Sequence, residues 1–182
     1  LLYAGFDVLS IANNHIWDYG KEALVDTIRY LLADGILPVG AGNSYQEANS
    51  PVVRNIKGTR VAYLAYTMLY PIALNAGDTS SGVSEFNLEK ITKRIKDLKS
   101  ASLSDIIVIS MHWGEEYQTR SNKEQQKIAH ALIDAGADLI VGHHPHVAQE
   151  VEHYKSGWIA YSLGNFVFDQ SFSEETMKGL LL

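Results

Sequence analysis

Strand-length apolar runs alternate with amphipathic segments along this chain, and this alternation constrains its fold more than any other feature. Asp7 to Ala12, Ile106 to Met111 and Leu139 to Val141 are apolar runs of strand length. Gly20 to Asp34 and the segment from Ser121 to Ala135 carry apolar residues at helical spacing. Because each run of one kind is followed by one of the other, the sequence predicts a layered α/β domain with mostly parallel core strands.

Further segments complete this pattern. We expect a short strand at Ile36 to Val39, a loop from Met68 to Ser84, and a helix whose core stripe runs from Leu88 to Leu98. We also expect two hairpins. One pairs Pro51 to Ile56 with Arg60 to Thr67, and the other pairs Val147 to Tyr154 with Trp158 to Leu163. Ser121 with Glu124 resembles a capping box, and Gly136 predicts the end of that helix. Since no repeat or linker divides residues 1–182, we expect a single domain. Both ends of the chain read as interrupted elements, so we expect a domain truncated at both ends.

Composition excludes several classes of function. The chain is 46% hydrophobic and 20% charged, which is typical of a folded globular domain. Its net charge is -6 and it has no basic block, so nucleic acid is not an expected partner. Its apolar runs are too short for a membrane segment. It has no cysteine, so any metal site must use histidine, asparagine and carboxylate ligands.

Three polar clusters follow three of the predicted strands. They are Asn13-Asn14-His15, His112-Trp113-Gly114 and His143-His144-Pro145-His146, which together hold five of the seven histidines. In open α/β sheets, ligands bind at the carboxyl ends of the strands. Because imidazole nitrogens and amide oxygens suit zinc, iron and manganese, the sequence predicts a metal site at this edge.

Two of these clusters also have a purely structural interpretation. His112 alone could be a satisfied histidine at the end of a strand, and Asn13-Asn14 could serve only to form a turn. The third cluster is harder to explain structurally. Alternate residues of an extended segment project to the same side, so we expect His144 and His146 to face one centre, and His143 is the doubtful member.

Other polar residues are weaker candidates. Glu116 could supply a carboxylate, although it could equally be solvated with Glu115. We interpret His130 and His153 as structural or surface residues. In the segment after Gly164-Asn165 we expect buried aromatic residues, with Asp169 orienting a metal-binding histidine.

These motifs together resemble those of a known family. They are Gly5-Phe6-Asp7, Ala12-Asn13-Asn14-His15, Asp18-Tyr19-Gly20, His112-Trp113-Gly114, Glu116-Tyr117, Gly136-Ala137-Asp138, Gly142-His143-His144-Pro145-His146-Val147 and Tyr161-Ser162-Leu163-Gly164-Asn165-Phe166. In order and spacing they resemble the CapA family of bacterial capsule (poly-γ-glutamate) biosynthesis proteins, a branch of the calcineurin-like metallophosphoesterase superfamily. The resemblance covers nearly the whole chain.

The resemblance implies an αββα sandwich with two divalent metal ions, manganese, iron or zinc, at the sheet edge. It implies that Asn14, His112, His144 and His146 bind metal and that His15 is the general acid; Asn13, His143, Glu116 and Asn165 are possible additional site residues. The superfamily's two acidic strand-end motifs lie upstream of its Asn-His motif, and neither is present before Asn14. We therefore expect weak or single-metal occupancy in this chain.

For the intact protein, the resemblance implies a hydrolase that cleaves a phosphate ester with metal-activated water. The alternative is a non-catalytic accessory module that binds metal or the anionic polymer during poly-γ-glutamate synthesis or export. Its partners would be a phosphate ester, or the polymer and its synthesis machinery. By family analogy we expect an extracytoplasmic location in the bacterial cell envelope, with a membrane anchor outside this chain. A purely structural α/β domain would require the histidine clustering to be accidental.

Overall fold

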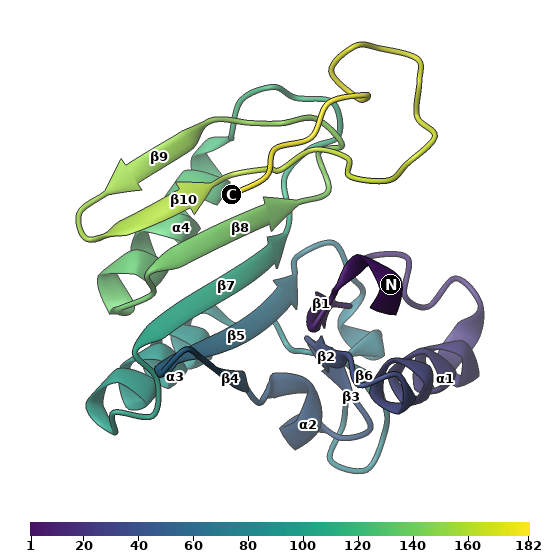
Figure 1. Cartoon of the computed structure of the whole chain (residues 1–182), viewed down its shortest axis with the longest axis vertical. Coiled ribbons are helices and arrows are strands. Elements are labelled where there is room, and N and C mark those ends of the chain that lie inside the picture. The colour runs from purple at the N-terminus through teal and green to yellow at the C-terminus, as the bar shows by residue number, and fades with distance from the viewer.

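A six-stranded mixed sheet forms the centre of the computed structural model, which describes residues 1–182 apart from the side chain of Leu2 (Figure 1). Its strands, in spatial order, are β4 (Val52–Ile56), β5 (Thr59–Thr67), β7 (Ile106–His112), β8 (Leu139–His143), β10 (Gly157–Ala160) and β9 (Val151–Tyr154). The four inner strands are parallel, and β4 and β9 add antiparallel edges through the two hairpins. The prediction of a mostly parallel core with added hairpins is thus confirmed.

Two helices cover one face of this sheet. They are α3 (Leu88–Ser100) and α4 (Lys123–Ala135), which lie behind the strands in Figure 1. Ile95 of α3 and Leu132 of α4 are fully buried against alternate residues of β7, among them Ile109 and Met111. Because side chains alternate across a strand, this burial turns His112 toward the opposite face.

A second, smaller sheet lies on that opposite face. It pairs β1 (Val8–Ser10) in parallel with β2 (Leu37–Val39), and Ala12 and Val39 pack against Ala65 of β5. Its outer side is covered by α1 (Gly20–Ala33), through residues such as Leu24 and Ile28. The layers therefore run α1, small sheet, large sheet, then α3 and α4, which is the predicted αββα order.

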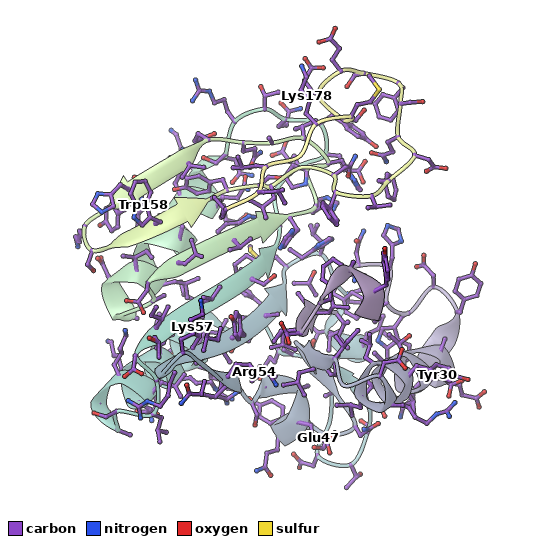
Figure 2. All side chains as sticks on the ribbon, in the orientation of Figure 1. Tyr30, Glu47, Arg54, Lys57, Trp158 and Lys178 are labelled. Atoms are coloured by element: carbon purple, nitrogen blue, oxygen red, sulfur yellow. The ribbon has the colours of Figure 1, made fainter. Side chains whose placement is uncertain are left out.

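Charged residues also connect the two sheets. Arg54 of β4 donates a hydrogen bond from its guanidinium to the carboxylate of Asp7, at 3.3 Å, just before β1 (Figure 2). An exposed pair of this kind contributes at most about 1 kcal/mol, so the apolar contacts carry most of the packing.

The remaining elements lie beside the small sheet. They are η1 (Leu2–Ala4), β3 (Ala41–Gly42), α2 (Tyr45–Asn49), η2 (Ile72–Leu74) and β6 (Gly82–Val83), with β3 and β6 paired antiparallel. The segment predicted as a loop thus contains η2 and β6. The sequence pattern missed α2 because five residues are too few to show a period. Within the part of the chain that the structure describes, no helix is long and apolar enough to cross a membrane.

The start of α4 differs from the prediction by one residue. Asn122, rather than Ser121, accepts a hydrogen bond from the Gln125 backbone N–H, and the Gln125 side chain accepts one from the Asn122 N–H, each at 2.9 Å. Ser121 instead donates its hydroxyl to Glu150 at 2.6 Å. Its side chain is therefore used for a tertiary contact and does not cap the helix. At the other end, Gly136 adopts the predicted left-handed conformation, with φ of 115°.

Candidate metal centre

A cleft of about 460 Å³ opens where the carboxyl ends of β1, β7 and β8 meet. It is lined by Leu9, Ser10, Ala12, Asn13, Asn14, His15, His112, His143 and His146. All three polar clusters singled out in the sequence therefore contribute to one concave surface. The strand ends bring these residues together from positions about 130 apart in the chain.

The strand register places two histidines side by side in the lining of the cleft. His112 ends β7 and His143 ends β8, and the two are paired directly across the parallel ladder. The backbone N–H of Trp113 donates to the carbonyl of His143 at 3.1 Å, which continues the ladder past the strand end. The sheet itself therefore fixes how these residues are spaced.

The two neighbouring asparagines have different roles. Asn13 Oδ1 accepts the backbone N–H of His15 at 2.8 Å, which is ordinary turn chemistry. Asn14 Oδ1 lies 2.9 Å from His112 Nε2 and so links the loop after β1 to the end of β7. The structural interpretation thus accounts for Asn13, whereas Asn14 reaches across the cleft.

His15 is paired with a carboxylate that sequence reasoning did not select. Its Nδ1 lies 2.9 Å from Asp18 Oδ2, and both side chains are exposed to solvent. The sequence feature that could have identified Asp18 as a partner of His15 is its place three residues later in a turn. In the sequence, Asp18 was identified only as part of a motif. A carboxylate at Nδ1 orients the ring and leaves Nε2 available for another contact.

Three ligand groups converge beside the cleft. One carboxylate oxygen of Glu116 and one ring nitrogen each of His144 and His146 all lie within 4.8 Å of one another. The His144 ring is also 5.1 Å from that of His112, measured between centroids. The predicted histidine pair thus faces one centre, and Glu116, not Glu115, supplies the nearby carboxylate.

The sequence did not indicate the backbone conformation that brings these histidines together. His144 has φ of 98° and His146 has φ of 60°, so the segment is a left-handed turn and not an extended strand. The expectation based on strand alternation was therefore wrong about the backbone. Left-handed conformations are uncommon in residues other than glycine, and where they occur they cluster at functional sites.

Asn165 lies directly behind the cluster. Its Oδ1 is 2.8 Å from His146 Nδ1. The expected orienting role of Asp169 is wrong, because Asp169 is exposed and Asn165 makes this contact instead. Phe166 and Phe168 were expected to be buried but are 70% and 57% exposed. The segment leaves the sheet at Gly164 and forms a loop over the surface.

Two further histidines lie outside the site, as expected. His130 stacks on Tyr154 at a centroid distance of 3.8 Å and contacts the Glu152 carboxylate at 3.0 Å. His153 lies against Trp158 on the β9–β10 hairpin. Both are thus structural or surface residues.

Burial keeps His112, His143 and His144 neutral near pH 7. It lowers the pKa of His112 to about 3, with help from the nearby imidazoles of His144, His143 and His146. Burial also lowers the pKa of His143 to about 4. For His144, burial lowers the pKa while the Glu116 carboxylate opposes the shift. A neutral imidazole is the form that binds metal, so these groups are ready to act as ligands near neutral pH.

The donor set fits a divalent metal ion. It offers imidazole nitrogens, one carboxylate and one amide oxygen, the ligand types that zinc, manganese and iron accept in proteins. Within the described residues, Glu116, His144 and His146 are the three that come close enough to share one ion, and Asn14 with His112 forms an adjacent pair.

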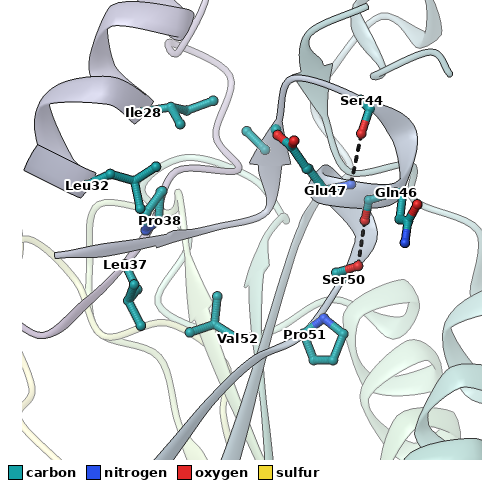
Figure 3. Close-up of a pocket in the computed structure, with 12 residues that line it drawn as sticks. Ile28, Leu32, Leu37, Pro38, Ser44, Gln46, Glu47, Ser50, Pro51 and Val52 are labelled. Carbon is teal, nitrogen blue, oxygen red and sulfur yellow. Dashed lines mark hydrogen bonds between the residues drawn. The ribbon is translucent and has the colours of Figure 1, made fainter. Parts of the chain in front are cut away.

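A larger cleft of about 550 Å³ lies elsewhere, between α1, β2 and α2 (Figure 3). Its lining combines apolar residues such as Ile28 and Leu37 with polar ones such as Glu47 and Ser50. These polar groups are already engaged locally: the Glu47 carboxylate accepts the Asn43 N–H at 2.8 Å, and Ser50 donates to a carbonyl of α2. This cleft offers no set of reactive groups comparable with the histidine cluster.

Comparison with known proteins relates this chain to bacterial capsule synthesis proteins. A family model described as "Bacterial capsule synthesis protein PGA_cap" matches residues 1–170. The chain is 43% identical over 181 residues to "Capsule biosynthesis protein CapA" of Bacillus anthracis, covering 98% of this chain and 44% of that protein. It is 39% identical over 177 residues to "PGA biosynthesis protein CapA" of Bacillus subtilis (strain 168), covering 97% and 46%. The chain therefore spans less than half the length of these relatives.

One solved structure tests the fold. The structure of Haemophilus influenzae NAD nucleotidase (NadN) superposes with a TM-score of 0.53 at 13% identity, over 87% of this chain and 35% of that one. At this identity the likeness concerns the fold alone. It agrees with the layered α/β architecture expected from the metallophosphoesterase resemblance.

Proposed function

The chain belongs to the family of bacterial capsule synthesis proteins described as PGA_cap, and from this premise we propose that it is the metal-binding part of a phosphoesterase-like domain in such a protein. The observation that carries the proposal is the convergence of Glu116, His144 and His146 within 4.8 Å, beside a cleft that also holds Asn14 and His112. Imidazole rings gathered around an open cleft are an arrangement that a packed core does not need.

The residues would divide into two adjacent groups of ligands. Glu116, His144 and His146 would hold one ion, and Asn14 with His112 would contribute to a second. When bound, a divalent metal supplies a nucleophilic hydroxide at neutral pH and neutralises charge on the phosphoryl oxygens. His112 and His143 are half-buried whereas His15 is exposed, so a substrate would enter from the side of the cleft where His15 lies.

His15 would donate a proton to the leaving group. Its position at the mouth of the cleft and its exposed side chain allow it to approach a bound ester. Asp18 accepts from Nδ1, so the Nε2 proton is the one available for transfer.

In the whole protein, we propose that this activity serves capsule or poly-γ-glutamate biosynthesis, at an extracytoplasmic site in the cell envelope. The names of the Bacillus relatives support the first part of this proposal. The substrate would be a phosphate ester, since the cleft gathers ligands of the kind that clamp phosphoryl oxygens.

The first test measures metal content by elemental analysis, in both this chain and the complete gene product. We expect His144→Ala and His146→Ala to lose metal, because each removes a nitrogen from the cluster of three ligands. His153→Ala is the matched control, since it removes an exposed imidazole on the β9–β10 hairpin. If neither protein holds metal, the proposal fails.

The second test measures release of p-nitrophenol from p-nitrophenyl phosphate and its diester by the complete gene product. Metal-dependent release that the His146→Ala variant loses would support the phosphoesterase. Stable metal binding without turnover of either ester would favour the accessory module that binds metal or the anionic polymer.

A further inference from the structure

Hydrogen bonding around Asn165 determines which way its amide points. Its Nδ2 donates to the carbonyl oxygen of Thr176 at 2.9 Å and to Gln170 Oε1 at 3.3 Å. Because a backbone carbonyl can only accept, the group facing Thr176 must be the NH₂. The oxygen of Asn165 therefore faces His146.

This orientation also determines the proton position on His146. Asn165 Oδ1 can only accept, so His146 Nδ1, 2.8 Å away, must be the donor. In the neutral ring the lone pair is then on Nε2. The ring is held from other sides as well, by Tyr117 at a centroid distance of 6.1 Å and by Phe168 at 5.3 Å.

We infer that Asn165 is a positioning residue for the metal centre: it fixes the tautomer and direction of His146 so that Nε2 binds the ion. This inference rests on the proposed function, because it assigns Asn165 a role at the same site. His146 needs such support because its backbone is left-handed, with φ of 60°, which the local sequence does not by itself favour.

The same side chain connects the metal centre to the exposed loop that follows it. This loop, residues 166–176, is part of the yellow segment beyond β10 in Figure 1. Thr176 is 1% exposed and its hydroxyl donates to the Gln170 carbonyl at 2.7 Å, so the loop is closed on itself where Asn165 binds it. The two NH₂ bonds of Asn165 therefore anchor the loop, and its oxygen anchors His146.

Three substitutions separate these roles. Asn165→Ala removes both the acceptor for His146 Nδ1 and the donors to the loop. It should weaken metal binding about 10- to 100-fold, the usual effect of losing the hydrogen-bond partner of a metal-binding histidine. Asn165→Asp keeps an acceptor for Nδ1 but loses the donors, so it should restore affinity to within about threefold of wild type while the loop becomes more sensitive to protease. Gln170→Ala removes one loop contact and should leave affinity unchanged.

Affinity is measured by isothermal titration of the complete gene product with Zn²⁺ and Mn²⁺, with Asn43→Ala as an exposed control. The tautomer is read independently, from the ¹⁵N shifts of His146 in metal-free protein. A protonated Nδ1 in wild type, lost in Asn165→Ala, supports the inference. A protonated Nε2 in wild type, or wild-type affinity in a folded Asn165→Ala variant, overturns it. If wild type binds neither metal, the proposed function fails, and the tautomer measurement still tests the role of Asn165.

Discussion

Gly142 is the position at which one added methyl group should do most damage to the histidine cluster. It lies in β8, immediately before His143. A Cβ at this position would overlap the carbonyl oxygen of Tyr161 and lie 2.7 Å from Trp113 Nε1. Those two groups are themselves hydrogen-bonded at 3.0 Å, and both residues are buried. Alanine would therefore intrude between a buried donor and its acceptor.

The cost of Gly142→Ala follows from two effects. Overpacking a close-packed site costs about 1–3 kcal/mol. Leaving the indole N–H of Trp113 without a buried partner costs about 1–3 kcal/mol more. Since small domains are stable by only about 5–15 kcal/mol, a loss of roughly 2–6 kcal/mol is a large part of the total. Metal affinity should fall as well, because His143 and His144 follow directly.

The assay is urea unfolding of the chain in chelator, followed by circular dichroism, for wild type, Gly142→Ala and Gly58→Ala. Gly58 is the control because it has φ of 92° and nothing within 4 Å of an added Cβ. Its substitution should cost only the left-handed penalty, about 1–2 kcal/mol. If Gly142→Ala loses less than about 1 kcal/mol, or no more than the control, the reasoning about this contact is refuted.

Three other predictions follow from the site and its supports. Asp18→Asn should lower phosphoester turnover in the complete gene product by about 10-fold or more while metal content stays unchanged, because only the partner of His15 is altered; equal loss of metal would contradict this. In chelator, the free energy of unfolding should fall as pH drops from about 6.5 toward 4. The pKa values of His112 and His143 are depressed in the folded chain, so over this range the unfolded chain binds protons at these residues and the folded chain does not. Unfolding midpoints measured across this pH range check the slope, and a rise in stability as pH drops would contradict it. Gln125→Ala should destabilise the chain by about 1–3 kcal/mol, since this buried side chain both caps α4 and donates to Gln149; thermal unfolding measures the loss.

Much of the fold could be predicted because its signals are local. The apolar run of β7 and the glycine that ends α4 determine their elements with few neighbours involved. The αββα order came from the family resemblance, and the packing of Ala12 and Val39 on Ala65 confirms it. The start of α4 was misplaced because two adjacent residues, Ser121 and Asn122, can both cap, and only a distant carboxylate decides between them.

The gathering of the three polar clusters at one cleft could be predicted, but the geometry of the cluster could not. Histidines at strand ends converge because parallel strands end together, and that rule needs no coordinates. The left-handed turn at His144 and His146 is a tertiary result that no local pattern signals. Asn165 contacts His146 from 19 positions away, so sequence reasoning could include it as a candidate without finding its partner. The metal assignments themselves stay predictions.

The contact between Asn14 and His112 also bears on how the fold is held together. These residues lie 98 positions apart; Asn14 follows β1 of the small sheet, and His112 ends β7 of the large one. Joining two points at that separation in a flexible chain costs about 4–5 kcal/mol of chain entropy. Folding of the two sheets against each other already includes this cost. An ion held by both residues would bind only that closed arrangement and would add about 2.7 kcal/mol of stability at a concentration one hundred times its dissociation constant. Metal supply would then govern how firmly the two sheets stay joined, and protein prepared in chelator would be the looser form.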